Sequence, residues 1–495
     1  MDTTKGLPMP HSETPPAEVG PLLGQTLAAH RNWTRTPSKA RADVLVTIGD
    51  ALEAAADELV PLARAETNLP EPRLRGELKR TGFQLRLFAD LLRGGDHLDA
   101  RLDHADPHWP MGAPRPDLRR SRRPIGPVLV YAASNFPFAF SVAGGDTASA
   151  LAAGNAVVVK AHPGHPRLSD ATASVVRSAL EDTGTEPDLL QVIHGREPGI
   201  AALRDPRIKA AGFTGSIPGG RALLDIAASR PDPIPFYGEL GSNNPVFVTH
   251  RAARERGDEI AAGFIASFTQ NAGQFCTKPG TLFVPAGSDL TEKLAATSLP
   301  AGEPMLNPAI ETAFRKTLAE RESHGSVEVL ARGEESDNAP APTLLRTRVE
   351  KLLADPATLE QECFGPTALV VEYDHEAQLV AAARSFGGQL TATVQAQESC
   401  DVGELAEELA ERAGRVLFNQ WPTGVSVTYA QQHGGPYPAT TAPGTTSVGT
   451  AAIERFLRPV AYQNFPQHLL PAELRDDNPE GFPRLENGRP AERDR

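Results

Sequence analysis

The chain has 495 residues, 40% of them hydrophobic and 22% charged, which is an ordinary globular composition and excludes a largely disordered or fibrous protein. Its 49 Lys and Arg against 62 Asp and Glu give a net charge of −13, which disfavours nucleic acid and anionic membranes as partners. The length predicts two or three domains.

The start of the chain and its cysteines indicate where the protein works. The opening segment MDTTKGLPMPHSETPPAEVG has no basic stretch followed by an apolar run, and no segment is apolar enough to span a membrane. Cys276, Cys363 and Cys400 are too few for a disulfide framework and lack the spacing of a zinc site. We therefore expect a cytoplasmic protein with free thiols and no metal centre.

The first part of the chain predicts an arm followed by helices. Residues 1–20 are rich in Pro, Thr and Glu without apolar periodicity, which predicts a flexible arm. Apolar residues recur at helical spacing over residues 38–65 and 74–92, which predicts two helices. Residues 96–123 are rich in Pro and Arg, which predicts extended or looped chain.

From residue 127 onward, short apolar runs alternate with helical stretches, the pattern of βαβ units around a parallel sheet. Two successive sets of such runs predict an α/β fold with two α/β domains. The first set comprises residues 127–132, 156–160, 189–193 and 208–213. The second set comprises residues 245–249, 281–285, 368–373, 389–394 and 415–419.

Two loop residues are the first candidates for chemistry. Cys276 lies in the glycine-containing loop FTQNAGQFCTKPG, from which its sulfur could point into a cleft. A lone free cysteine is more often a small buried hydrophobic residue, so Cys276 alone does not establish a nucleophile. Glu239 in FYGELGSNNP lies beside glycines that let the backbone approach a ligand, but alone it would be an ordinary loop carboxylate.

Further motifs follow strands of the first set, where open α/β sheets place their ligands. The amide of Asn135 in SNFPFAF can donate to a developing oxyanion, and Lys160 and His162 follow the run AVVVK. The turn FTGSIPGGR opens a predicted helix whose free N–H groups suit a pyrophosphate, although it does not match the spaced three-glycine fingerprint. Its candidate residues are Gly215, Ser216 and Gly220.

Taken together in chain order, these motifs resemble the aldehyde dehydrogenase superfamily from about residue 40 to about residue 465. The most specific strings are GQFC, GELGS, FTGS, SNFP and ECFGP. Longer strings, such as SVAGGDTASALAAGNAVVVKAHPGHP and GRVLFNQWPTGV, are similar to 2-oxoglutarate semialdehyde (2,5-dioxopentanoate) dehydrogenases and their NADP-dependent fatty aldehyde relatives. The resemblance implies a Rossmann-like NAD(P)-binding domain, an α/β catalytic domain and a small β element for oligomerisation.

The resemblance also implies domain boundaries. The NAD(P)-binding domain would comprise residues 21–101 and 125–238, and the catalytic domain residues 239–450. The oligomerisation element would comprise residues 102–124 and 451–475, so that the arginines between Arg119 and Arg123 lie on a solvated or interface face of a homodimer or homotetramer. Residues 476–495 would form a peripheral tail.

By the same resemblance, Cys276 attacks the aldehyde carbon and Asn135 holds the resulting oxyanion together with the Cys276 N–H. Glu239 then activates the water that hydrolyses the thioester to a carboxylate. His433, in HGGPYPATT, occupies a place where relatives of this branch carry a histidine near the thiol. It either assists thiolate formation or water activation, or is a hydrogen-bonded loop histidine.

For the cofactor, the resemblance implies that Lys160 reaches the adenosine ribose and Ser216 the pyrophosphate. Glu362 and Phe364 of ECFGP would contact the nicotinamide ribose and ring, with Cys363 between them as packing. NAD-dependent members commonly carry a Glu three residues after the lysine, where this chain has Pro163. With Lys160 and His162 nearby, we predict that NADP is accepted as well as NAD.

Other functions stay open at this point. A CoA-acylating dehydrogenase would release the thioester to a thiol, but such enzymes generally lack the water-activating glutamate that Glu239 supplies. A catalytically silent protein of the same fold is disfavoured because Cys276, Glu239 and Asn135 are all present. The substrate, 2-oxoglutarate semialdehyde or alternatively a fatty or other aldehyde, depends on resemblance alone.

Overall fold

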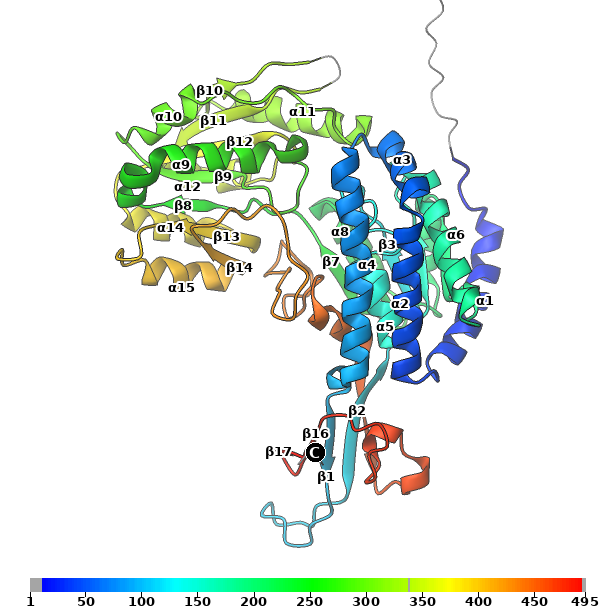
Figure 1. Cartoon of the computed structure of the whole chain (residues 1–495). Coiled ribbons are helices and arrows are strands. Elements are labelled where there is room, and N and C mark those ends of the chain that lie inside the picture. The colour runs from blue at the N-terminus through cyan, green and yellow to red at the C-terminus, as the bar shows by residue number, and fades with distance from the viewer. Residues whose placement is uncertain (1–10, 337–338, 492–495) are drawn as a thin grey trace, which may run out of the picture.

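The computed structural model describes residues 11–336 and 339–491, which form two large lobes and a narrow β extension below them (Figure 1). The predicted α/β fold is confirmed, because each lobe is built on a sheet of mostly parallel strands flanked by helices. Among the described helices, none combines the length and the apolar character that crossing a membrane requires.

The first lobe contains a parallel five-stranded sheet with the order β5-β4-β3-β6-β7. Most of its strand residues are buried, and the apolar runs predict every strand except β7, whose sequence FYGE is short and lies between prolines and glycines. The strands are β3 (Val128–Tyr131), β4 (Val157–Lys160), β5 (Leu190–Ile193), β6 (Ala210–Thr214) and β7 (Phe236–Glu239).

The strand order of this sheet determines where a ligand can bind. The chain runs from β3 to β4 and β5 on one side and then to β6 and β7 on the other. At such a switch point, an open parallel sheet leaves a crevice beyond the carboxyl ends of its strands. The helices that connect the strands are α5 (Gly145–Ala153), α6 (Pro166–Asp182), α7 (Arg196–Arg204) and α8 (Ile217–Ala228).

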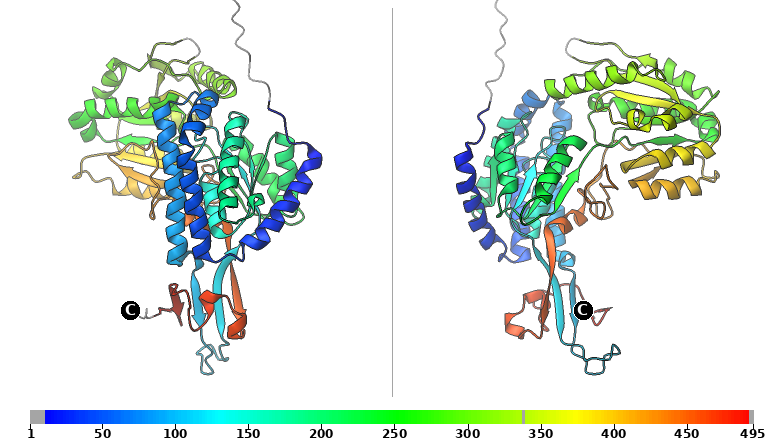
Figure 2. Two further views of the ribbon diagram at one scale, coloured as in Figure 1. Left: turned by 45° about the vertical axis from the view of Figure 1, so that its right-hand side comes forward. Right: turned by 180° about the vertical axis from the view of Figure 1, so that it is seen from behind.

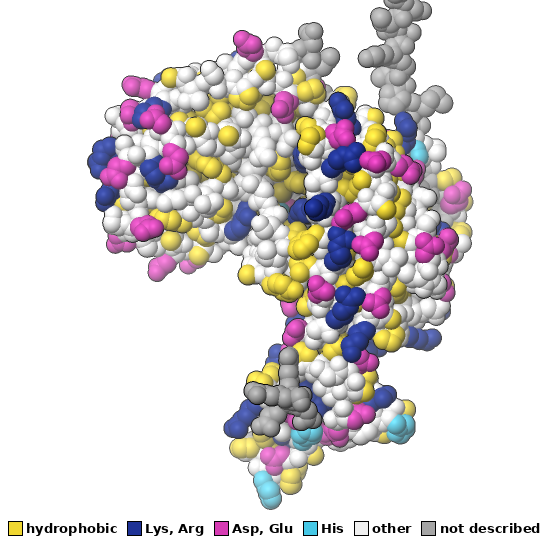
Figure 3. Space-filling model, in the orientation of Figure 1, with side chains coloured by type: hydrophobic (Ala, Val, Ile, Leu, Met, Phe, Trp, Pro, Cys, Tyr) yellow, Lys and Arg dark blue, Asp and Glu magenta, His cyan; other side chains and the backbone are white. Residues whose placement is uncertain are grey.

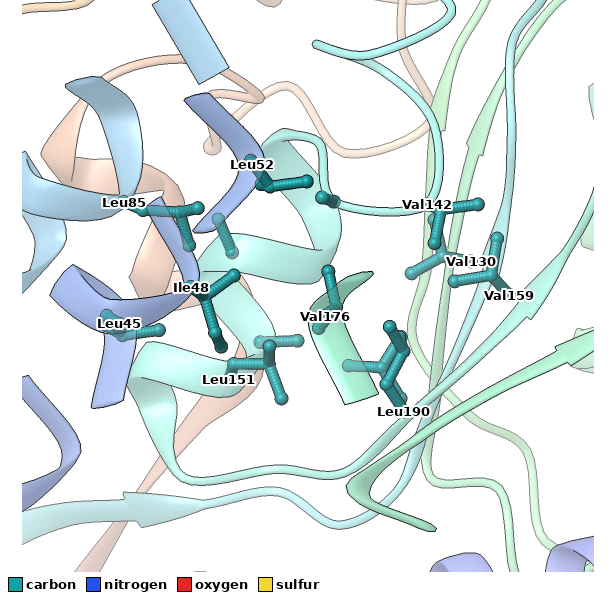
Figure 4. Close-up of a cluster of buried hydrophobic side chains, with 14 of the residues drawn as sticks. Leu45, Ile48, Leu52, Leu85, Val130, Val142, Leu151, Val159, Val176 and Leu190 are labelled. Carbon is teal, nitrogen blue, oxygen red and sulfur yellow. The ribbon is translucent and has the colours of Figure 1, made fainter. Parts of the chain in front are cut away.

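The core of the first lobe lies between this sheet and the helices that cover it (Figure 4). Ile48, Leu85 and Leu151 come from three helices, and Val130 and Val159 come from the sheet. Each such side chain, once buried, stabilises the fold by about 1.5–3 kcal/mol. The core therefore holds the strand ends, and the motifs that follow them, in fixed places.

Four helices precede this sheet, and two expectations about them are wrong. The arm expected through residue 20 ends earlier, because α1 begins at Pro16 and buries Val19 and Leu23 at helical spacing. The helix expected over residues 38–65 is broken at Ala55. Residues 1–10 lie outside the described residues. The helices are α1 (Pro16–Trp33), α2 (Ser38–Ala54), α3 (Ala56–Thr67) and α4 (Glu71–Gly94).

The second lobe contains a seven-stranded sheet with the order β10-β11-β12-β9-β8-β13-β14, parallel except for β10. The apolar runs do not predict β10 and β11, because both carry charged residues. The strands are β8 (Val246–Val248), β9 (Thr281–Pro285), β10 (Glu328–Arg332), β11 (Thr343–Arg348), β12 (Thr367–Tyr373), β13 (Gln389–Gln395) and β14 (Ala413–Phe418). The helices are α9 (His250–Thr269), α10 (Leu290–Ala296), α11 (Pro308–Glu322), α12 (Val349–Ala354), α13 (Pro356–Leu359), α14 (Ala377–Ser385) and α15 (Gly403–Arg412).

The β extension joins distant parts of the chain, as both views of Figure 2 show. Its order is β15-β2-β1-β16-β17, and the tail expected to be peripheral from residue 476 instead supplies β16, which pairs with β1. Its short, charged strands carry no apolar run that would predict them. Residues 492–495 lie outside the described residues. The strands are β1 (Ala100–Asp103), β2 (Leu118–Pro124), β15 (Leu457–Gln463), β16 (Arg484–Glu486) and β17 (Arg489–Pro490).

Candidate active site

A strained turn presents Cys276 between the two lobes. After α9, the chain forms a 3₁₀ segment in which Asn271 and Ala272 have φ angles of 49° and 53°. Gly273 follows with φ 63°, and a Cβ atom there would lie 2.2 Å from the carbonyl oxygen of Gly365. Only glycine fits this position, and the turn leaves the Cys276 side chain partly exposed.

Glu239 is the last residue of β7 and is buried, with 4% of its surface exposed. The chain around it is held by the segment that follows His433. Leu240 N–H donates to the Ala439 carbonyl at 2.8 Å, and Gly238 N–H donates to the Thr441 hydroxyl at 2.8 Å. The carboxylate is therefore fixed at the boundary of the two lobes.

His433 brings the thiol and the carboxylate together. Its Nε2 lies 3.5 Å from Cys276 Sγ and 2.9 Å from Glu239 Oε1. Although the second contact has an ion-pair distance, Oε1 makes no directed hydrogen bond within the described chain. The other oxygen, Oε2, accepts a hydrogen bond from the Ser447 hydroxyl. His433 Nε2 thus contacts both the sulfur and the carboxylate, and Glu239 Oε1 can still accept a hydrogen bond from another donor.

The charges of this cluster depend on one another. Burial by itself would lower the pKa of His433, but the negative charge of Glu239, and then the charge of Cys276 and the hydrogen bond to its sulfur, raise it to about 10. Burial by itself would raise the pKa of Glu239, but His433, Ser447 and the charge of Arg455 lower it below its ordinary value. Glu239 is therefore ionised at neutral pH and able to accept a proton.

A small cavity lies beside the carboxylate. Its volume is about 20 Å³, enough for one water molecule, and Glu239, His433, Ser447 and Arg455 contribute to its walls. A water molecule in this cavity would lie next to Glu239 and His433. The geometry thus combines a nucleophile, a base and room for the water that the base would activate.

Asn135 lies at the other side of the thiol loop. It is 9% exposed, and its Nδ2 donates to the Gln274 carbonyl at 3.2 Å, two residues before Cys276. The Arg73 guanidinium donates to the Asn135 carbonyl at 2.5 Å. The structure therefore brings Cys276, Glu239, Asn135 and His433 to one place, as the sequence predicts.

Asn244 ties the loop of Glu239 to the loop of Cys276. In a left-handed conformation with φ 53°, it donates from Nδ2 to the carbonyl oxygens of Cys276 and Lys278, both at 2.9 Å. The Gln389 side chain accepts from the backbone N–H groups of Asn243 and Asn244 at 2.7 and 3.0 Å. These buried polar bonds fix the spacing of the nucleophile and the base.

The turn at the start of α8 fits a pyrophosphate. Gly215 and Ser216 are exposed, and the Ser216 hydroxyl caps the helix by accepting from Gly219 N–H at 3.3 Å. At Gly220 a Cβ atom would lie 2.1 Å from Leu240, so glycine is needed for the helix to pack this closely. The open N-terminus of this 12-residue helix lies at the switch point of the sheet.

Lys160 is the last residue of β4, and His162 follows it at the same edge of the sheet. Burial lowers the pKa of His162 to about 3, so its imidazole is neutral and only Lys160 offers positive charge here. Burial lowers the pKa of Lys160, whereas the carboxylate of Glu13, which comes from the N-terminal segment, raises it. Glu13 packs against Gly195 at the start of α7, so an acidic group that the motifs do not predict borders this site.

Glu362 and Phe364 are partly buried in the loop before β12, and Cys363 between them is buried in the core of the second lobe, as expected. Burial raises the pKa of Glu362 to about 7, and the nearby Lys278 opposes this rise. The Lys278 ammonium donates to the carbonyl oxygens of Cys363 and Thr367, both at 2.8 Å. It therefore holds the loop that carries Glu362.

Some residues of the site cannot be found from the motifs. Ser447 and Asn244 are short polar residues in loops, and their sequence contexts give no sign of their partners. The charged face of α4 does leave a signal, because Arg73, Glu77 and Arg80 recur at spacings of four and three among leucines that are buried. Charged side chains on the partly buried face of a helix need partners, which marks this face of α4 for closer inspection.

Comparisons with known proteins concern the family and the fold of the chain. A model of the aldehyde dehydrogenase family matches residues 12–458. The chain is 43% identical over 479 residues to the alpha-ketoglutaric semialdehyde dehydrogenase of Acinetobacter baylyi, covering 95% of this chain and 91% of that one. It is 45% identical over 465 residues to alpha-ketoglutaric semialdehyde dehydrogenase 2 of Azospirillum brasilense, covering 92% and 88%.

Among solved structures, aldehyde dehydrogenase C of Pseudomonas syringae, in complex with NAD⁺ and octanal, has a TM-score of 0.78 and 21% identity, covering 92% of this chain and 90% of that one. A 3,6-anhydro-L-galactose dehydrogenase has a TM-score of 0.77 and 21% identity, covering 91% and 92%. These two similarities concern the fold.

Proposed function

Because this chain belongs to the aldehyde dehydrogenase family, we propose that it oxidises α-ketoglutaric semialdehyde to α-ketoglutarate, with NADP or NAD as the oxidant. The observation that carries the proposal is the contact of His433 Nε2 with both Cys276 Sγ and Glu239 Oε1, at 3.5 and 2.9 Å. Such a cluster can form a thioester on sulfur and release it to water.

In the first half of the reaction, the Cys276 sulfur attacks the aldehyde carbon and forms a thiohemiacetal. The side-chain amide of Asn135 and the Cys276 N–H stabilise the negative charge that develops on the substrate oxygen. Asn135 lies within 3.2 Å of the loop before Cys276, which supports this role. When bound, NAD(P)⁺ supplies the hydride acceptor that allows the thiohemiacetal to become a thioester.

The residues near the two strand ends fit such a cofactor. The exposed N-terminus of α8 and the close packing at Gly220 suit a pyrophosphate, and Lys160 ends β4, which is separated from β6 by β3 in the same sheet. We propose that Glu362 and Phe364 hold the nicotinamide end, since the loop that carries them lies against Gly241, next to the Glu239 turn.

In the second half, Glu239 takes a proton from a water molecule in the adjoining cavity, and the water oxygen attacks the thioester carbon. The C–S bond breaks, and the carboxylate product and the Cys276 sulfur are released. His433 is placed to stabilise both anions, because the same nitrogen faces the carboxylate and the sulfur. The buried Glu239 carboxylate beside that cavity supports water, rather than CoA, as the acceptor.

A panel of aldehydes tests the proposal. The purified protein is given α-ketoglutaric semialdehyde, succinic semialdehyde, pentanal, octanal and benzaldehyde, and the formation of NADPH and NADH is measured. We expect the highest kcat/KM for α-ketoglutaric semialdehyde and no activity in Cys276→Ala. A preference for octanal would refute the proposed substrate, and turnover that depends on CoA would refute hydrolysis.

We further propose that the protein works in the cytoplasm as a homodimer or homotetramer. Two edge strands support self-association, since β14 and β15 each end a sheet, and β14 exposes Val416 and Phe418. Light scattering after size-exclusion chromatography measures the assembly directly. A monomer at micromolar concentration would refute the oligomer.

A further inference from the structure

One face of α4 carries charged side chains toward the thiol loop. Arg73, Glu77 and Arg80 follow each other at helical spacing, while Leu74, Leu78 and Leu85 of the same helix are buried in the core. Figure 3 shows Lys and Arg side chains along α4, beside the recess between the two lobes. Burying charged side chains costs free energy unless they form ion pairs or hydrogen bonds.

Arg73 stacks between the aromatic residues that flank Asn135 and Cys276. Its guanidinium lies 4.9 Å from the ring centres of both Phe136 and Phe275, and its side chain is 13% exposed. One nitrogen, Nη2, donates to the Asn135 carbonyl at 2.5 Å. The other, Nη1, is buried without a hydrogen-bond partner in the described parts of the chain.

Arg80 lies about two helical turns after Arg73 on the same face of α4. Its guanidinium is 5.6 Å from the ring centre of Phe140, and that ring is 6.3 Å from the ring of His433. Its Nη1 is also buried and unpartnered among residues 11–336 and 339–491. Burial lowers the pKa of Arg80, and the charge of Glu77 opposes this most strongly, followed by those of Cys276 and Glu239.

The acid between these arginines does not satisfy them. Glu77 Oε1 accepts the backbone N–H groups of Phe138 and Ala139 at 2.8 and 3.0 Å, and Oε2 lies 3.9 Å from the Arg73 guanidinium. Two guanidinium groups therefore face one carboxylate. The Nη1 atoms of Arg73 and Arg80 are buried and have no hydrogen-bond acceptor among the described residues. The stripe has an excess of positive charge and free donors, which is the chemistry that a carboxylate ligand needs.

We propose that Arg80, with Arg73 beside it, binds the carboxylate at the far end of the aldehyde substrate and so selects acids that carry an aldehyde at the other end. This inference rests on the proposed function and assigns the residues that recognise the carboxylate of that substrate. Both arginines act in specificity rather than in the chemistry at sulfur. Neutral aldehydes would leave their N–H groups unpartnered and would bind less tightly.

The test compares two substrates of equal chain length in three proteins. Wild type, Arg80→Gln and Arg75→Gln are assayed with α-ketoglutaric semialdehyde and with pentanal. Arg75 is a matched control because it lies on the same helix and is paired with Glu71 at the surface. We expect Arg80→Gln to lower kcat/KM for the semialdehyde about 10- to 100-fold, as for a lost charge-assisted bond, with pentanal changed less than about threefold.

A second measurement tests the role of Arg80 without requiring catalytic turnover. Cys276 is alkylated with iodoacetate, which is anionic, and with iodoacetamide, which is neutral. Arg80→Gln should slow the reaction with iodoacetate relative to iodoacetamide, and Arg75→Gln should not change this ratio. Equal losses with both aldehydes and an unchanged ratio of alkylation rates would assign Arg80 a structural role and overturn the proposal.

The two proposals fail in different ways. If wild type oxidises pentanal but not the semialdehyde, the proposed substrate is wrong. If wild type prefers the semialdehyde and Arg80→Gln keeps that preference, the substrate stands and the role of Arg80 is wrong. Thermal melting of each variant shows whether the fold is kept, and Arg80→Lys, which restores the charge, should recover part of the preference.

Discussion

The hydrogen bond from Ser447 to Glu239 offers the sharpest test of the proposed base. Ser447→Ala removes the donor to Oε2 and leaves the buried carboxylate facing only His433 and the charge of Arg455. The anionic form of Glu239 loses stabilisation, so its pKa rises. The water-activating step then requires a higher pH, while attack by Cys276 is unchanged.

The size of the effect follows from the kind of bond. A hydrogen bond to a charged group contributes about 1.5–3 kcal/mol, and a tenfold change in an equilibrium corresponds to about 1.4 kcal/mol. Because Glu239 is only 4% exposed, solvent replaces little of the lost bond. We therefore expect the acid limb of the kcat profile to move to higher pH by about one to two pH units.

Stopped-flow measurement of NAD(P)H formation separates the two half-reactions. In Ser447→Ala we expect a burst that matches the concentration of active sites and a steady rate that falls as the pH is lowered. Ser141→Ala is the matched control, since Ser141 is buried and its hydroxyl has no partner in the described structure. An acid limb that stays in place, or a burst that slows in parallel with the steady rate, would refute the role of Glu239.

Four further predictions concern the nucleophile, the base, the cofactor and the core. Cys276→Ala should abolish turnover without changing cofactor binding, measured by quenching of protein fluorescence; residual turnover would exclude Cys276 as the nucleophile. Glu239→Gln should keep a burst but lower the steady rate about 10²- to 10⁴-fold, and an unchanged steady rate would contradict it. Glu13→Gln, which removes a carboxylate near Lys160, should lower KM for NADP relative to NAD about two- to fivefold, and an unchanged ratio would place the ribose elsewhere. Leu151→Ala, at 1% exposure, should cost about 2–5 kcal/mol of unfolding free energy in urea titrations, and a loss below this range would mean that the core closes around the cavity.

The parts of the fold that the sequence predicts are those with a local cause. Buried parallel strands such as Val157–Lys160 are continuous apolar runs because both faces of the sheet are covered. The apolar runs do not predict β7, which lies beside prolines, or β10, which mixes charged and apolar residues. Both segments form strands through pairing with neighbouring strands of the sheet. The same holds for β16, whose partner β1 lies at the other end of the chain.

The residues of the candidate site also differ in whether a local motif predicts them. Cys276, Glu239 and Asn135 are recognised because each lies in a specific short motif. The contact of His433 with Cys276 spans 157 residues, and only the resemblance of HGGPYPATT to relatives suggests it. The contact of Ser447 with Glu239 spans 208 residues, and no motif indicates it. The neutral state of His162 also follows only from burial, which the motif around it does not predict.

The bonds of Asn244 have a consequence for motion and for evolution. Because one side chain holds the carbonyl oxygens of Cys276 and Lys278 while its backbone N–H is held by Gln389, the two loops move as one body. These bonds resist any change in the gap between the Cys276 sulfur and the Glu239 carboxylate. Changes elsewhere in the cleft can then alter which aldehyde is accepted, and the chemistry at the thiol is inherited intact.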